Sequence, residues 1–321
     1  MRAFFHIVSA ALMTALAGPP AAAQSPYPSK QIRLIVPTPA GGPSDVSARL
    51  IGQALSKSMG QTVVVENRPG ASGALAAQAL MAAPPDGHTL MWTLSSMSGL
   101  AFLQKSSPYQ TLAELTPVSL IGHFTYAMFI HPDVPAATVA EFVEYARAHP
   151  DKTGYATGSL GDYMASTKFL KATGVRSVRV PYKGGSQLMP DLVAGRVQLN
   201  FGPASSGLPY AKDGKLRMLA VVATQRSPLA PEVPTLAEAG VTGVSLPTWQ
   251  AIFAPPNTPA EIAARLSREV VVALANPGLR AQLEQLALQP EGSTPAALAA
   301  AVLRDTQVWR SFVSEYEIPP E

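Results

Sequence analysis

The chain contains no cysteine among its 321 residues, which excludes disulfide frameworks, thiolate nucleophiles and cysteine-based zinc or redox sites. Charged residues are also scarce, at 14%, and the 24 basic and 21 acidic side chains nearly cancel. No run of lysine or arginine concentrates the small basic excess, so we expect no nucleic-acid partner. Apolar residues make up 47% of the chain, which is enough to bury a core, and the length allows two domains.

Motifs for catalysis and for metal binding are scarce as well. The chain has no HExxH metal motif, no Walker phosphate loop and no Gly-x-Gly-x-x-Gly nucleotide fingerprint. The nearest approach to a hydrolase elbow, residues 157–161 around Ser159, lacks the first glycine, so a secreted α/β hydrolase stays only as an alternative. We interpret His131-Pro132-Asp133 and His149-Pro150-Asp151 as turns rather than metal ligands. We therefore expect no cofactor, no metal and no enzymatic activity.

Residues 1–23 have the order of a secretory signal peptide. Arg2 supplies a positive charge, an apolar stretch runs from Ala3 to Ala17, and small residues precede Gln24, where we expect cleavage. The apolar stretch is shorter than the ~20 residues that a membrane span needs. We therefore expect an exported protein that resides in the periplasm.

Segments with the pattern of strands and of helices alternate along the rest of the chain. Apolar strands at 32–36, 62–66 and 88–94 alternate with helical patterns, and a second alternating set runs from 126 to 223. Three helical segments follow residue 259, each with a proline near its start. This order predicts an α/β protein in which each sheet is mostly parallel and covered by helices on both faces.

The second alternating set predicts a second lobe inserted into the first. The helices after residue 259 are left over once that set is complete, so we expect them to pack on the first lobe and make it discontinuous. The cleft between two such lobes is a natural site for a small molecule. The expected boundaries are residues 24–125 plus 248–321 for lobe 1 and residues 126–247 for lobe 2.

Two loops of similar design join a strand to a helix, one in each predicted lobe. The first runs from Thr38 to Asp45 and the second from Thr157 to Asp162, and both are rich in small residues that let a ligand approach the main chain. Unpaired N–H groups at a helix start favour an anion through hydrogen bonds and the helix dipole. Two such loops that face each other would hold a carboxylate without any arginine.

Several longer segments carry a more specific pattern, namely VENRPGASG at 65–73, PDGHTL at 85–90, VPYKG at 180–184, GRV at 195–197 and the run from Arg226 to Gly240. With these segments the chain resembles the periplasmic solute receptors of tripartite tricarboxylate transporters, often called Bug-type receptors. The resemblance covers essentially all of the chain after the signal peptide. It implies a two-lobed type II periplasmic-binding fold with a ligand cleft between the lobes. It also implies a monomer that closes on a small organic acid and delivers it to the membrane subunits of a transporter.

The resemblance further implies that the two loops bind the ligand carboxylate, largely through main-chain N–H groups and ordered water. A ligand-sensing subunit of a signalling system, which would contact a sensor instead of a permease, stays as a second alternative. Tyr182, Asn200 and Trp249 are weaker candidates, for the wall of the cleft. The candidate ligand-binding residues are Thr38, Ala40, Gly41, Gly42, Ser44, Asp45, Thr93, Ser95, Thr157, Gly158, Ser159, Leu160, Gly161, Asp162, Tyr182 and Asn200.

Three positions depart from the pattern of the family. Pro43 stands where a third glycine is common, which removes one N–H donor from the first loop. Asp162 and Ala165 stand in the second loop and its helix where serine and histidine are common. We interpret Asp162 as the N-cap of that helix. If its carboxylate instead faced the cleft, it would repel a second carboxylate, which would favour a mono-acid or a ligand with an amino or amide group over a citrate-like one.

Overall fold

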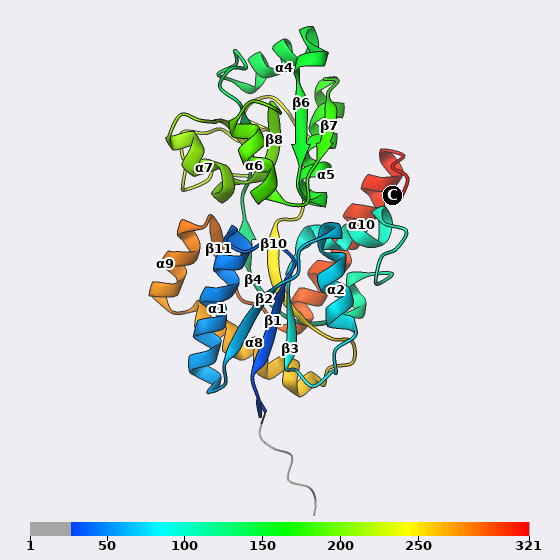
Figure 1. Cartoon of the computed structure of the whole chain (residues 1–321), viewed down its shortest axis with the longest axis vertical. Helices are drawn as coiled ribbons and strands as arrows, with labels where there is room; N and C mark the ends of the chain where they lie inside the picture. Colours follow the sequence, from blue (N-terminus) through cyan, green and yellow to red (C-terminus); the bar gives the residue numbers. More distant parts are fainter. Residues whose placement is uncertain (1–26, 321) are drawn as a thin grey trace, which may run out of the picture.

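The computed structural model describes residues 27–320. The expected signal peptide, residues 1–23, lies outside the described residues. Two sheets lie one above the other in Figure 1, a six-stranded sheet in the lower lobe and a five-stranded sheet in the upper lobe. None of the described helices combines the length and the apolar character that crossing a membrane requires.

The lower sheet has the strand order β11-β4-β10-β3-β1-β2. Helices α1, α8 and α9 pack on one face of this sheet, and α2, α3 and α10 pack on the other, each against its own cluster of buried aliphatic and aromatic side chains. The strands are β1 (Ile32–Val36), β2 (Val63–Asn67), β3 (Thr89–Leu94), β4 (Thr116–Phe124), β10 (Trp249–Ala254) and β11 (Leu288–Pro290). The helices are α1 (Pro43–Met59), α2 (Ala74–Met81), α3 (Leu100–Leu103), α8 (Ala260–Leu274), α9 (Pro277–Gln285) and α10 (Pro295–Glu315), with short 3₁₀ helices η1 (Ala71–Gly73), η2 (Ser95–Gly99) and η3 (Leu112–Glu114).

The upper sheet has the strand order β7-β6-β8-β5-β9. Helices α4 and α5 cover one face and α6 and α7 the other, again with a separate buried cluster on each side. The strands are β5 (Tyr126–Ile130), β6 (Gly154–Thr157), β7 (Val178–Pro181), β8 (Leu199–Pro203) and β9 (Arg217–Val222). The helices are α4 (Val139–Ala148), α5 (Leu160–Thr173), α6 (Gly185–Val193) and α7 (Ala204–Lys212), with the 3₁₀ helix η4 (Pro150–Lys152).

The prediction of mostly parallel sheets is confirmed only in part. β1, β2 and β3 are parallel, as are β6, β7 and β8, but β10 is antiparallel to both β3 and β4, and β5 is antiparallel to both β8 and β9. The reason is the path of the chain between the lobes. β5 and β10 each enter their sheet from the other lobe, through the edge where the parallel strands end, so each must run in the opposite direction.

The two lobes are connected by adjacent stretches of main chain. β4 lies in the lower sheet, and a single residue, Thr125, separates it from β5 in the upper sheet. The chain returns just before β10, where the Phe124 N–H donates to the Thr248 carbonyl at 2.7 Å. The two crossings are therefore hydrogen-bonded to each other.

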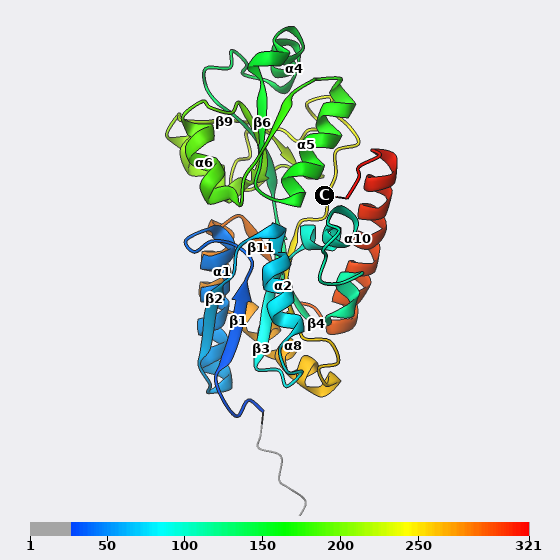
Figure 2. The same ribbon diagram turned by 45° about the vertical axis from the view of Figure 1, so that its right-hand side comes forward.

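The C-terminal end of α10 makes a further contact between the lobes, beside α5 (Figure 2). The Lys171 ammonium lies 3.8 Å from the Glu315 carboxylate and 4.2 Å from the centre of the Tyr316 ring. The rings of Tyr163 and Phe312 meet edge to face at 6.2 Å. Helix α10 thus packs in the core of the lower lobe, and its C-terminal end also contacts α5 of the upper lobe.

Candidate functional site

The two loops singled out in the sequence both lie where the lobes meet. Each leaves the carboxyl end of a parallel strand, β1 or β6, and ends in the first turn of a helix, α1 or α5. A methyl group placed on Gly184, at the start of α6, would lie 3.4 Å from Pro39 Cδ in the first loop. One placed on Gly158, in the second loop, would lie 2.8 Å from the Gly184 carbonyl carbon. The start of α6 therefore lies next to both loops.

Asp45 holds the first loop in shape. Its carboxylate accepts hydrogen bonds from the Gly41 amide at 2.9 Å, Arg49 Nε at 3.1 Å and Asn67 Nδ2 at 2.9 Å. Gly41 has a φ of 80°, a conformation that glycine adopts without strain. Gly42 is the N-cap of α1. These contacts fold the loop back over the side chain of Asp45, which is only 3% exposed.

Asp162 holds the second loop in the same way. Oδ2 accepts from the Gly158 amide at 2.8 Å, and Oδ1 accepts from Ser159 Oγ at 2.6 Å and from the Tyr126 hydroxyl at 3.0 Å. The prediction that Asp162 caps α5 is wrong, because the helix begins at Leu160 and Ser159 is the N-cap, whose Oγ accepts from the Asp162 amide. Asp162 is 4% exposed and lies beneath the loop.

The two carboxylates occupy equivalent positions but have opposite electrostatics. Each is the third residue of its helix and accepts the amide of the residue before the N-cap. Burial raises the pKa of Asp45, but hydrogen bonds from Arg49, Gly41 and Asn67 outweigh burial, so the net pKa lies below its usual value. Burial raises the pKa of Asp162 to about 6, and the hydrogen bonds from Ser159, Gly158 and Tyr126 only partly offset it.

Both loops contain main-chain donors that the fold leaves unused. Six main-chain amides in the two loops have no hydrogen-bond acceptor within residues 27–320. Each of them lies next to the start of α1 or α5. Such donors, together with the positive end of the helix dipole, favour an anion. Pro43 removes one donor from the first loop but fits the first position of α1, where no helical hydrogen bond is lost. The amides are those of Ala40, Ser44 and Asp45 in the first loop and Ser159, Leu160 and Gly161 in the second.

The side chains of the other candidates are engaged within the protein. Ser95 Oγ donates to the Pro247 carbonyl, and the Tyr182 hydroxyl donates to Asp191 at 2.8 Å. Asn200 Nδ2 donates to the Ala156 carbonyl at 3.0 Å, inside the upper sheet. Tyr182 and Asn200 therefore support the upper lobe.

Four further hydroxyl and ring groups were candidates in the sequence. Thr157 Oγ1 accepts from Arg179 Nε at 3.1 Å. Trp249 is buried in the lower core, and its indole N–H donates to the Asp305 carboxylate. Thr93 and Thr38 differ from these, because their Oγ1 atoms are buried without a hydrogen-bond partner among the described residues. Thr38 therefore has the loop hydroxyl that is buried without a hydrogen-bond partner among the described residues.

The sequence reasoning missed Gln250 and Tyr126. Gln250 Nε2 donates to Ser44 Oγ at 3.3 Å, next to the start of α1, and its Oε1 is buried without a partner among the described residues. A glutamine within the otherwise apolar strand β10 was the available signal. Nothing local distinguished Tyr126 from an ordinary strand residue, because its contact with Asp162 joins positions 36 residues apart.

Ser159 does not have the surroundings of a nucleophile. Its Oγ donates to the Asp162 carboxylate and accepts from the Asp162 amide, and no histidine within residues 27–320 bonds to it. A catalytic serine needs a general base within hydrogen-bonding reach. The described residues also contain no group of three or more histidine, aspartate or glutamate side chains that could hold a metal ion.

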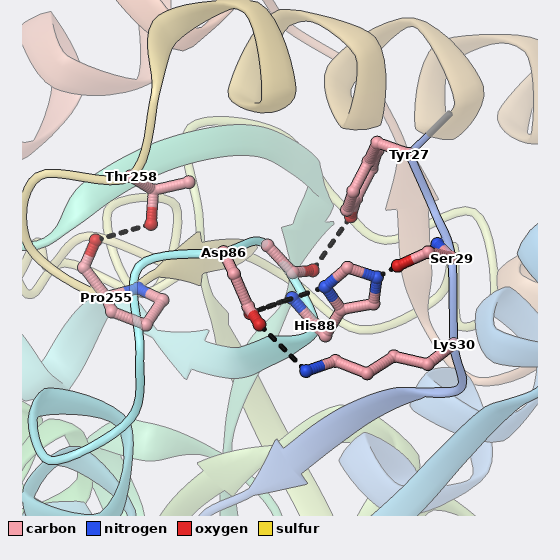
Figure 3. Close-up of polar contacts among 8 residues, drawn as sticks. Tyr27, Ser29, Lys30, Asp86, His88, Pro255 and Thr258 are labelled. Atoms are coloured by element: carbon pink, nitrogen blue, oxygen red, sulfur yellow. Dashed lines mark hydrogen bonds and ion pairs between the residues drawn. The ribbon is translucent and has the colours of Figure 1, made fainter. Parts of the chain in front are cut away.

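The PDGH segment of the sequence lies just before β3, at the amino end of the parallel strands of the lower sheet, and makes several polar contacts (Figure 3). The Tyr27 hydroxyl donates to the Gly87 carbonyl at 2.8 Å, and the Ser29 amide donates to His88 Nε2 at 3.2 Å. Lys30 Nζ pairs with the Asp86 carboxylate at 2.9 Å. This segment therefore fastens the chain before β1 to the lower lobe, far from the two loops.

Comparison with known proteins gives a consistent result. The profile of the tripartite tricarboxylate transporter family receptor matches residues 47–313. The protein BugT of Bordetella pertussis is 33% identical over 297 residues, which cover 90% of each chain. An R. palustris protein solved with adipate has a TM-score of 0.87 and 30% identity, and covers 92% of this chain and 100% of its own. MatC from Rhodopseudomonas palustris, solved with bound malate, has a TM-score of 0.83 and 30% identity, and covers 89% and 100%.

Proposed function

Because the chain belongs to the tripartite tricarboxylate transporter family of receptors, we propose that it binds a small organic carboxylate between its lobes in the periplasm and delivers it to the membrane subunits of such a transporter. The family is one of solute-binding receptors and not of enzymes, so the hydrolase alternative is abandoned.

One observation carries the proposal. The two loops that meet at the interlobe junction each offer three unpaired amides at a helix start, and each is held open by a buried aspartate. A carboxylate is the anion that such donors suit, because each of its two oxygens accepts hydrogen bonds from several N–H groups. The absence of arginine and lysine from both loops is then no obstacle, since amides and helix dipoles supply the positive potential.

The relatives also support a carboxylate ligand. Two structures that are 30% identical to this chain hold adipate and malate, which are both dicarboxylates. The Asp162 carboxylate is buried beneath the second loop and is hydrogen-bonded to Gly158, Ser159 and Tyr126. These bonds give no support to a preference for a mono-acid, so dicarboxylates belong in the first set of ligands to test.

A thermal-shift screen tests the proposal. The protein without residues 1–23 is mixed with mono-, di- and tricarboxylic acids of two to eight carbons, and each acid is paired with its neutral amide. At 100 times its dissociation constant, a ligand stabilises the folded state by about 2.7 kcal/mol, or roughly 5 °C in Tm for a chain of this size. We expect at least one acid to give such a shift and its amide to give none. A screen in which no acid stabilises more than its amide contradicts the proposal.

Delivery to a transporter needs a separate experiment in cells. Uptake of the acid found in the screen should fall when the receptor gene is deleted and recover with the wild-type gene. It should not recover with a Gly158→Ala variant, in which the added methyl group would collide with Gly184. Uptake that is independent of the receptor gene would favour the sensing alternative.

A further inference from the structure

The two loops are held by carboxylates whose hydrogen-bond donors differ in kind. Every donor to Asp45 is an N–H group, from the Gly41 amide, the Arg49 guanidinium and the Asn67 amide. These groups can only donate, so a proton on Asp45 would cost at least one of these hydrogen bonds. The carboxylate is also paired with Arg49 at 3.0 Å. Asp45 is therefore built to stay ionised.

Asp162 is built differently. Two of its three partners are hydroxyl groups, of Ser159 and Tyr126, and a hydroxyl can accept a hydrogen bond as well as donate one. A proton on Oδ1 can be donated to either hydroxyl, while Oδ2 keeps the Gly158 amide. The loop therefore keeps its hydrogen bonds in both protonation states of Asp162.

The groups around Asp162 do not compensate its charge. Tyr126, from β5, is the titratable side chain in direct contact with it. Arg179, from β7, binds Thr157 and lies over the Tyr163 ring, and Lys183, in the turn before α6, is exposed. From η2, the polar residues are serines, and β8 contributes Asn200. On α5 itself, Lys171 lies more than two turns further on and pairs with Glu315 of α10, and Lys168 donates to the Ser245 carbonyl.

We propose that the second loop binds its carboxylate ligand together with a proton, which Asp162 takes up from solvent as the ligand binds. This inference rests on the proposed function, because it places the ligand carboxylate on the Ser159, Leu160 and Gly161 amides. The ligand carboxylate and Asp162 would repel each other if both were ionised in a poorly solvated site, so one of them takes up a proton. Asp162 is the one whose hydrogen-bond partners accommodate that proton. The balance is one ligand anion plus one proton bound, and both are released together.

Linkage gives the sign of the effect. Ligand binding raises the affinity of Asp162 for its proton, so a proton raises the affinity of the loop for the ligand by the same factor. Asp162 has one titration midpoint in the free protein and a higher one in the ligand-bound protein. Between these two pH values, the dissociation constant of the ligand anion should rise by up to tenfold per pH unit. Above the bound midpoint it should be constant.

Acetate, the smallest carboxylate probe, tests this directly by NMR in wild-type protein with labelled aspartate side chains. At matched ionic strength, saturating acetate should shift the Ser159, Leu160 and Gly161 amides and raise the titration midpoint of Asp162 Cγ. Acetamide, which has the same shape and no charge, should not raise that midpoint. Amide shifts without a change in the Asp162 midpoint would overturn the inference and leave the proposed function intact. If neither the amides nor Asp162 respond to acetate, the proposed site and the inference both fail.

Two variants supply an independent readout. Asp162→Asn keeps an acceptor for Gly158 and donors for the two hydroxyls but cannot take up a proton, so its acetate affinity should be independent of pH from 6 to 8. Asp305→Asn removes another buried carboxyl, on α10 and bonded to Trp249, and should keep the wild-type pH dependence. A pH dependence that Asp305→Asn abolishes and Asp162→Asn retains would overturn the assignment. The wild-type NMR titration decides the question if Asp162→Asn fails to fold.

Discussion

The Tyr126 hydroxyl donates a hydrogen bond to Asp162 Oδ1 at 3.0 Å and so joins the first residue of β5 to the first turn of α5. Gly161 makes this approach possible, because a side chain at that position would collide with the Tyr126 hydroxyl. Tyr126 also follows Thr125, where the chain crosses between the lobes. The second loop is therefore tied to the crossing by one buried carboxylate.

Asp162→Asn should change the pH dependence of stability. The pKa of Asp162 is raised from 3.8 to about 6 in the folded protein, so the folded state binds this proton more tightly than the unfolded state. The group therefore lowers the free energy of unfolding as pH rises from about 4 to about 6, and the loss is complete above pH 6. The variant lacks this loss. Its stability relative to wild type should rise by roughly 3 kcal/mol between pH 4 and pH 7, as measured by urea unfolding. A difference that does not vary with pH would show that burial of this carboxylate is not costly.

Asp45→Asn should change the pH dependence of stability in the opposite direction. The pKa of Asp45 is lowered in the folded protein, so its stabilisation is present above the pKa of the unfolded chain and is lost as pH falls through the folded value. An asparagine amide would face the N–H donors of Gly41, Arg49 and Asn67, and at least one of them would lose its acceptor. We expect a loss of about 1–3 kcal/mol at pH 7 that shrinks below pH 4, measured by the same method. A variant as stable as wild type at pH 7 would contradict the role given to Asp45.

Gly158→Ala should weaken ligand binding. The new methyl group would lie 2.8 Å from the Gly184 carbonyl carbon and 2.9 Å from the Gly185 nitrogen, and main-chain atoms cannot yield without moving α6. We expect a loss of about 1–3 kcal/mol in stability and at least tenfold in affinity for the acid that binds wild type best, by isothermal titration calorimetry. Gly185→Ala is the matched control, because a methyl group there meets nothing within 4 Å. Equal behaviour of the two variants would mean that the contact with α6 does not shape the loop.

Trp249→Phe should destabilise the protein in a pH-dependent manner. The Trp249 indole donates to the Asp305 carboxylate, whose pKa burial raises to about 6. Without that donor the ionised carboxylate is left unpaired, so we expect a loss of about 1–3 kcal/mol at pH 8 and a smaller loss at pH 5. Trp309→Phe is the control, because the buried Trp309 indole has no hydrogen-bond partner among the described residues. Its loss should be the same at both pH values, and a pH-dependent loss there would undermine the explanation.

The alternation of strands and helices could be predicted because it depends on local periodicity. The directions of β5 and β10 could not, because they depend on where the chain crosses between lobes. Both loops could be located from their small residues, but their internal hydrogen bonds could not be predicted. Ser159 and Asp162 have the spacing of a capping box, so the N-cap was within reach of the sequence. The Tyr126 contact and the burial of Trp249 against Asp305 depend on residues far apart in the chain.

The single residue between β4 and β5 limits how the lobes can move. One residue spans less than about 4 Å, and the returning strand is hydrogen-bonded alongside through Phe124 and Thr248. The lobes therefore cannot slide or separate at this point. A change in the angle between the lobes would therefore be a rotation about an axis through the paired crossings, with an arc that lengthens with distance from Thr125.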